Sequence, residues 1–206
     1  MIVIPYKYYG LMRTTIRGAV VTLMILGLFV WSVVHFVPTL GLSFKNGVIE
    51  KYGDKTYMAV FSILIVLSLV MIVFGWRSTI PEFVYVLPLS TKPIAMLLIV
   101  VAFILFGAAK HATRVKQFVR HPQLSSVIVW AVAHLMLNGD SRSIVLFGGL
   151  AIWAMIEIVL INRREGAWVK PDVPSWKQEF VGLGISAVMI VVVVFLHPYI
   201  AGVPVR

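Results

Sequence analysis

Six long apolar runs, separated by polar and basic connections, make up most of the chain. They cover residues 18–37, 58–76, 94–109, 124–137, 144–161 and 181–196. A helix needs roughly 17–25 apolar residues to cross the ~30 Å hydrocarbon core of a bilayer. The third and fourth runs are shorter, so we expect their helices to extend into polar flanks or to pack against protein. No strand-like alternation is visible, and the pattern predicts an all-α, polytopic membrane helix bundle with about six transmembrane helices.

Composition excludes soluble enzymes, disordered chains and DNA-binding domains. Apolar residues make up 60% of the chain and charged residues only 13%, against about 45–50% and about 25% in soluble domains. The net charge of +10 comes from Lys and Arg residues that lie between the apolar runs, as in membrane proteins. We therefore expect a lipid bilayer as partner and no nucleic acid. The absence of cysteine excludes disulfides, thiol catalysis and cysteine-ligated metal centres.

The distribution of Lys and Arg predicts the orientation. The first, third and fifth connections together carry 11 of these residues, whereas the other two connections and both terminal segments carry 7. Because cytoplasmic connections of membrane proteins carry the excess, we predict that these three are cytoplasmic and that both termini lie outside. The basic N-terminal segment favours the opposite orientation.

Two histidines lie well inside the apolar runs, His35 and His134. Ionisable groups within a span are costly and usually face a bundle interior, a partner or a cofactor. At ~1.5 Å per residue, His134 lies roughly 15–20 Å from the cytoplasmic end of its helix, and His35 about 5–10 Å. Two neutral histidines that face each other in a dry bundle can hold haem iron. The alternative role of each is a hydrogen bond to a neighbouring carbonyl.

A carboxylate also lies within a run. Glu157 comes six residues before Arg163, about 9 Å inside the predicted cytoplasmic face. An unpaired carboxylate there is strongly destabilised, so we expect it to be protonated or paired. The predicted partners are Arg120, His121 or His35. A brace between two helices and a proton-transfer group both remain open.

A short polar segment separates the fourth and fifth runs. Asn138-Gly139-Asp140 predicts a tight turn, so the two runs should form an antiparallel helix pair. Asp140 or Ser141 should then cap the next helix. Gly148-Gly149 predicts close helix packing or room for a flat ligand.

Several of these segments together resemble the NnrU family. The likeness rests on Arg120-His121-Pro122-Gln123, the run from Trp130 to Leu135, Asn138-Gly139-Asp140, Phe147-Gly148-Gly149, His35-Phe36-Val37-Pro38, Tyr57, Gly75-Trp76-Arg77, Glu157 with Arg163-Arg164, and His197. It implies that residues 1–206 form a single NnrU-like transmembrane domain, with residues 1–17 as an N-terminal extension. The chain departs from the family at Ser126, where a glycine is common.

The resemblance implies a function as well. Bacterial members are associated with denitrification through the nitrite and nitric oxide reductases, which implies a bacterial inner (cytoplasmic) membrane. A plant and cyanobacterial relative, zeta-carotene isomerase, is an integral membrane enzyme that uses haem b to convert a cis double bond to trans. Its proposed axial histidines occur in contexts that match His35 and His134. It also has a cysteine where this chain has Ala131, so ligand exchange of that kind is not expected here.

The leading hypothesis is therefore a haem b protein with a redox- or nitrogen-oxide-linked role. His35 and His134 are the predicted iron ligands, with Arg120 available for the propionates and His121 as a further cofactor-binding residue. The alternatives are a cis–trans isomerase of a hydrophobic polyene and a non-enzymatic subunit of a larger membrane complex. Arg120-His121-Pro122 also resembles the isoprenylcysteine methyltransferase group, which would bind S-adenosylmethionine.

Overall fold

The computed structural model describes the backbone of residues 6–203 and the side chains of residues 21–203. Its long helices are α1 (Tyr6–Leu40), α2 (Leu42–Tyr52), α3 (Asp54–Ser78), α4 (Lys92–Lys110), α5 (Pro122–Leu137), α7 (Gly149–Glu165) and α8 (Trp176–Ala201). The short elements are η1 (Leu89–Thr91), η2 (Arg114–Gln117), α6 (Ser141–Ser143) and a π-helical turn, η3 (Ile144–Gly148), that runs into α7. Residues 1–5 of the predicted N-terminal extension lie outside the described residues. The all-α prediction is confirmed.

Within the part of the chain that the structure describes, five helical segments are long and apolar enough to cross a membrane. They are Val21–Leu40, Asp54–Ser78, Leu89–Lys110, Ser141–Glu165 and Trp176–Ala201. The third predicted run reaches spanning length because its helix takes in η1 and its polar flank. The fourth run forms α5, whose 16 residues cover about 24 Å at ~1.5 Å per residue. This helix packs against α4 and α7, so the prediction of a multi-pass membrane bundle is confirmed with one helix shorter than the rest.

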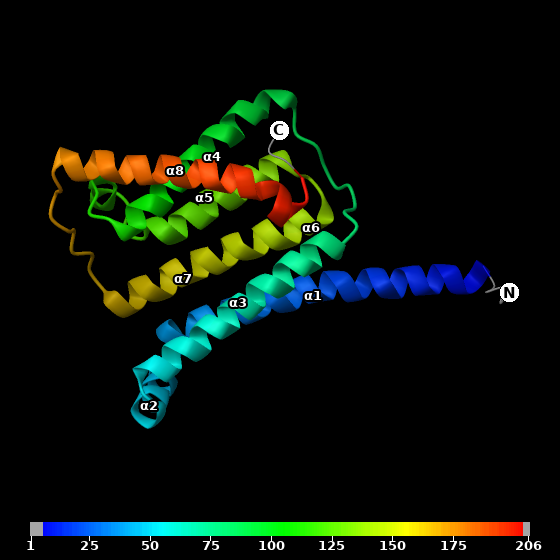
Figure 1. Ribbon diagram of the computed structural model, residues 1–206, viewed down its shortest axis with the longest axis horizontal. Coiled ribbons are helices and arrows are strands. Elements are labelled where there is room, and N and C mark those ends of the chain that lie inside the picture. Colours follow the sequence, from blue (N-terminus) through cyan, green and yellow to red (C-terminus); the bar gives the residue numbers. More distant parts are fainter. Residues whose placement is uncertain (1–5, 204–206) are drawn as a thin grey trace.

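Helix α7 lies between two helix pairs, α1–α3 and α4–α5 (Figure 1). α1 and α3 approach closely because Gly27 and Gly75 carry no side chain. A Cβ at Gly75 would lie 2.6 Å from the backbone nitrogen of Met24. Glycine at such contacts is typical of membrane helix packing, where close backbone approach supplies the van der Waals attraction. α8 packs on α4 at the outside of the bundle.

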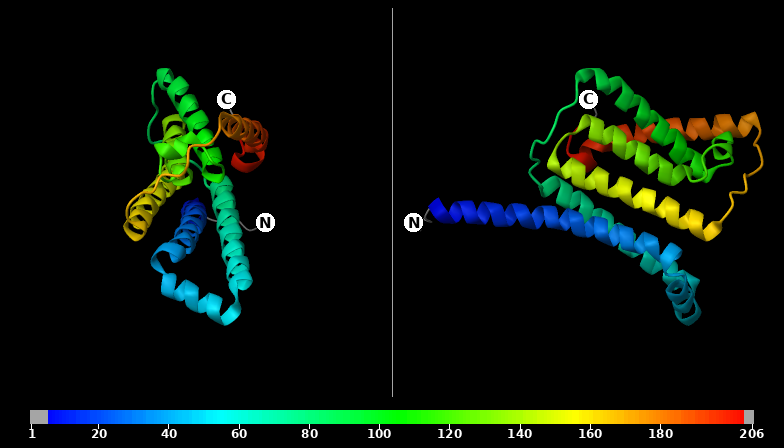
Figure 2. Two further views of the ribbon diagram at one scale, coloured as in Figure 1. Left: turned by 90° about the vertical axis from the view of Figure 1, so that its left-hand side faces the viewer. Right: turned by 180° about the vertical axis from the view of Figure 1, so that it is seen from behind.

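The connections alternate between two ends of the bundle (Figure 1). One end, here called the basic end, holds α2, the α4–α5 connection and the α7–α8 connection, which are the three connections rich in Lys and Arg. The other end, here called the opposite end, holds the α3–α4 connection, the α5–α6 turn and the end of α8. The N-terminal part of α1 projects beyond the opposite end (Figure 2, right). Which end faces the cytoplasm stays a prediction.

Candidate functional site

His35 lies on α1 in a shell of aromatic rings. Its ring centroid is 4.2 Å from that of Trp31, 5.0 Å from that of Trp153 on α7 and 5.7 Å from that of Phe61 on α3. Its Nδ1 lies 2.8 Å from the carbonyl oxygen of Trp31. A carbonyl only accepts, so Nδ1 carries the proton and donates it. The lone pair of this half-buried imidazole is therefore on Nε2.

His134 on α5 repeats the same arrangement. Its Nδ1 donates to the carbonyl oxygen of Trp130 at 2.9 Å, which again leaves the lone pair on Nε2. Its ring packs on Trp130 at 4.6 Å and on Phe147 of the π-helical turn at 4.5 Å between centroids. Histidines that bind metals almost always donate their other ring N–H to a carbonyl, carboxylate or water. Each histidine thus makes the bond to a neighbouring carbonyl that the sequence offered as the alternative to iron ligation, and Nε2 is the nitrogen left for a ligand.

The two histidines lie on different helices that flank α7. His35 contacts Trp153 and His134 contacts Phe147, six residues earlier, which is an offset of about 9 Å along that helix. No ring contact joins the two imidazoles among the described residues. To bind one iron together, the two side chains would have to bridge this offset.

Arg120 and His121, the other predicted cofactor-binding residues, lie at the basic end. Arg120 donates to the carbonyl oxygen of Gly166 at 2.8 Å and lies 3.4 Å from Glu165. His121 Nε2 is 2.9 Å from Asn162 Oδ1. These contacts fasten the start of α5 to the end of α7. The structure does not bring either residue together with His134, which lies 13 residues after His121, about 20 Å along α5.

Glu157 on α7 is 6% exposed and pairs with α1. The hydroxyl of Thr39 donates to its Oε1 at 2.5 Å, whereas its Oε2 has no partner. The sequence predicted Arg120, His121 or His35 as the partner, and this prediction is wrong, because the register of α1 and α7 brings Thr39 to the carboxyl. Arg164, two helical turns after Glu157, donates to the carbonyl oxygen of Pro38 at 2.7 Å instead.

The surroundings of Glu157 contain further polar groups that the sequence did not single out. Three more buried atoms have no partner among the described residues, namely Trp31 Nε1 on α1, Tyr57 Oη on α3 and Trp153 Nε1 on α7. We call the interface formed by Trp31, His35, Thr39, Tyr57, Trp153 and Glu157 the polar seam. The spacing carried a signal, because the residues of the seam on α1 and on α7 recur at intervals of four: Trp31, His35 and Thr39, and Trp153 and Glu157. The hydropathy pattern alone does not reveal the seam, since Trp and Tyr are counted as apolar residues in it.

His197 near the end of α8 is a second residue to which the sequence assigned no role in a site. Its Nδ1 donates to the carbonyl oxygen of Val203 at 2.6 Å. The end of α8 is fastened nearby, because Trp76 Nε1 donates to the carbonyl oxygen of Ala201 at 3.1 Å. His134 and His197 lie near the ends of α5 and α8, which both lie at the opposite end of the bundle (Figure 1).

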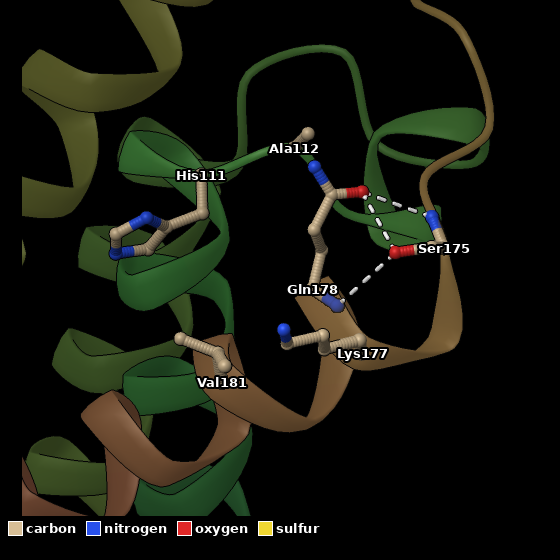
Figure 3. Close-up of a pocket in the computed structure, with 6 residues that line it drawn as sticks. All are labelled: His111, Ala112, Ser175, Lys177, Gln178 and Val181. Atoms are coloured by element: carbon tan, nitrogen blue, oxygen red, sulfur yellow. Dashed lines mark hydrogen bonds between the residues drawn. The ribbon is translucent and has the colours of Figure 1, made fainter.

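An open pocket of about 490 Å³ lies at the basic end, lined by His111, Ala112, Ser175, Lys177, Gln178 and Val181 (Figure 3). Ser175 and Gln178 close the capping box at the start of α8, so their polar groups already bind each other. His111 belongs to this surface pocket and lacks the aromatic shell of the two intramembrane histidines. It is a suitable control for experiments on them.

Comparison with known proteins places the chain in a family. A family model described as NnrU protein matches residues 23–205. This range includes His35, His134 and Glu157 and all helices from the spanning part of α1 to α8. No curated protein and no solved structure matches the chain. The chain thus belongs to the NnrU family and is a multi-pass membrane protein.

Proposed function

We propose that this protein is a membrane haem protein that binds haem b through Nε2 of His35 and of His134. The observation that carries the proposal is their shared geometry. Each imidazole donates Nδ1–H to the carbonyl four residues earlier, at 2.8 and 2.9 Å, and each is held by aromatic rings with Nε2 free of protein partners. A pair of neutral imidazoles fixed in this tautomer in an apolar bundle suits axial ligation of haem iron.

The surrounding residues have definite tasks in this proposal. Trp31 and Trp153 hold the imidazole of His35, and Trp130 and Phe147 hold that of His134, so neither ring can rotate freely. A haem bound there would supply one-electron redox chemistry, with its potential set by the two imidazoles and the apolar shell. Arg120 would reach a propionate only after releasing Glu165 and the carbonyl of Gly166.

The biological role that we propose is redox- or nitrogen-oxide-linked, in a bacterial inner membrane. Support comes from the association of the NnrU family with denitrification. A cis–trans isomerase is the enzymatic form of the same proposal, because it would use the same haem and take a hydrophobic polyene from the bilayer. The methyltransferase-like hypothesis has less support, since Arg120 and His121 already bind the end of α7.

The direct test is an absorption spectrum of the protein purified in detergent after expression with a haem precursor. We expect a six-coordinate, low-spin haem spectrum whose visible bands sharpen on addition of dithionite. Azide should leave the spectrum unchanged, because both axial positions are filled. Protein that carries no haem, even after incubation with haemin, would contradict the proposal.

A further inference from the structure

The polar seam concentrates the unsatisfied hydrogen-bonding groups of the bundle. Six buried side-chain N or O atoms lack a partner in the described part of the chain, and four belong to the seam. The other two are the Nε atoms of Arg114 and Arg142, whose guanidinium groups lie over the rings of Trp176 and Trp76. Buried polar side chains are bonded to protein or to ordered water in the great majority of cases. The seam is therefore the place in the described part of the bundle where bound water would satisfy the most buried groups.

The register of α1 and α3 arranges these groups in layers. His35 faces Phe61, and the two helices are antiparallel, so Thr39 lies level with Tyr57, one turn nearer the basic end. Glu157 joins this layer through its bond from Thr39. Trp153, one turn before Glu157 on α7, lies level with His35. A column of polar groups thus leads from the basic end to His35.

Proline adds an acceptor to this column. Pro38 lies inside α1 and has no N–H, so the carbonyl of Val34 lacks its usual helical donor. This carbonyl belongs to the turn that carries His35. The seam therefore contains three N–H or O–H donors, from Trp31, Tyr57 and Trp153, together with acceptors on either side of them. A buried water needs 2–4 polar partners, about 3 as a rule, and the seam can supply them.

Two cationic side chains lie near the seam, but both contact groups other than the Glu157 carboxyl. Arg164 donates to the carbonyl oxygen of Pro38, and the Nζ of Lys45 on α2 lies 5.6 Å from the centre of the Tyr57 ring. Neither makes an ion pair with Glu157 within the described residues. A buried carboxylate with one hydroxyl donor and no cation in contact is strongly disfavoured in a bilayer. Glu157 therefore belongs in the seam as a neutral carboxylic acid.

From this arrangement we propose that the polar seam is an intramembrane proton-transfer site with Glu157 as its proton-loading group. The O–H of the neutral Glu157 carboxyl gives its proton to ordered water held by Tyr57 and Trp153. The hydronium that forms passes this proton to water at the basic end, and hydronium from the same end returns a proton to the carboxylate, so atoms and charge balance without an oxidant or reductant. The column ends beside His35. The site does not depend on haem, and its test is independent of haem content.

Infrared spectroscopy of the purified full-length protein tests this proposal. We expect the carbonyl stretching band of a neutral carboxylic acid, which disappears in Glu157→Gln and moves to lower frequency in D₂O. Asp140→Asn is the matched control and should keep the band, because Asp140 is a half-buried carboxylate that caps a helix and pairs with Arg142. Absence of the band, or its persistence in Glu157→Gln, would overturn the proposal. A band that does not move in D₂O would also overturn it.

A second variant keeps the test decisive if Glu157→Gln does not fold. Thr39→Val retains the carboxyl but removes the hydroxyl that donates to Oε1. Loss of this hydrogen bond should move the carbonyl band to higher frequency. A band at the same frequency as in the parent protein would show that it does not come from Glu157 and would overturn the proposal.

Discussion

The regions around the two histidines differ in whether their buried polar groups have hydrogen-bond partners. Around His134, at the opposite end, Tyr85 Oη donates to the carbonyl of Leu135 at 2.5 Å, and Asn138 Nδ2 donates to the carbonyl of His134 at 3.0 Å. Around His35, in the polar seam, the hydroxyl of Tyr57 has no partner. Hydrogen-bond satisfaction therefore differs between the two regions, because the tyrosine near His134 donates to a carbonyl whereas the tyrosine near His35 has no partner among the described residues.

This difference separates the polar seam from a region whose polar groups are bonded to protein. We call that region, formed by Tyr85, Asn138, Asp140 and Arg142, the clasp. At the opposite end, Arg142 lies 4.2 Å from the centre of the Trp76 ring, and Asp140 caps the following helix through the N–H of Ser143 at 3.0 Å. These contacts fix the chain around His134, whose Nδ1 is bonded to the carbonyl of Trp130, and leave its Nε2 as the group that a ligand could bind. The seam has groups that only water, a proton or another ligand can satisfy.

The largest effect should come from separating α1 and α3, which support the seam. Gly75→Ala places a Cβ 2.6 Å from the backbone of Met24, so the helices must move apart. We expect the free energy of unfolding to fall by about 1–3 kcal/mol, measured by thermal or denaturant unfolding in detergent. The polar seam should admit more solvent as a result.

Gly184→Ala is the matched control, because a Cβ there meets nothing within 4 Å. It should unfold at the same temperature as the parent protein or slightly above, since alanine favours helix. Equal destabilisation by the two substitutions would show that the close approach of α1 and α3 is not the cause.

A pair of tyrosine variants sharpens the comparison directly. Tyr85→Phe removes a hydroxyl that donates to the carbonyl of Leu135 and should lower the free energy of unfolding by about 1 kcal/mol. Tyr57→Phe removes a hydroxyl without a protein partner, so its effect should be smaller than that of Tyr85→Phe. Both are measured by unfolding in the same detergent. A larger loss in Tyr57→Phe would contradict the distinction between clasp and seam.

The smallest effect should come from Glu157→Gln. The amide oxygen can still accept from Thr39, and a neutral acid loses no charge on this substitution. We expect a loss of about 1 kcal/mol or less in the free energy of unfolding. A loss of about 3–5 kcal/mol would instead indicate that a buried ion pair had been broken, and the comparison would have to be revised.

The helices could be predicted from the sequence because apolar runs of spanning length leave the backbone no alternative in lipid. The cap at Asp140 was also predicted correctly, since Asn138-Gly139-Asp140 encodes it locally. The short length of α5 was partly visible, because its run is one of the two shortest. The π-helical turn before α7 was not predicted, since no residue in Ile144–Gly148 marks it.

The candidate site could be predicted only as far as single residues. His35, His134 and Glu157 stood out as polar groups within apolar runs. The pairing of Glu157 with Thr39, and the position of Tyr57 level with Thr39, depend on the relative register of α1, α3 and α7. A pattern along one helix does not contain that register, so the sequence suggested charged partners where the structure has a hydroxyl.

The central claim, one haem held by His35 and His134, is tested most directly by electron paramagnetic resonance of the oxidised protein and three variants. The parent protein and His111→Ala should show the same low-spin signal with one haem per chain. His35→Ala and His134→Ala should each lose the haem or change it to a high-spin, five-coordinate form. A low-spin signal that survives in either variant would show that another residue, such as His197, ligates the iron and would contradict the assignment.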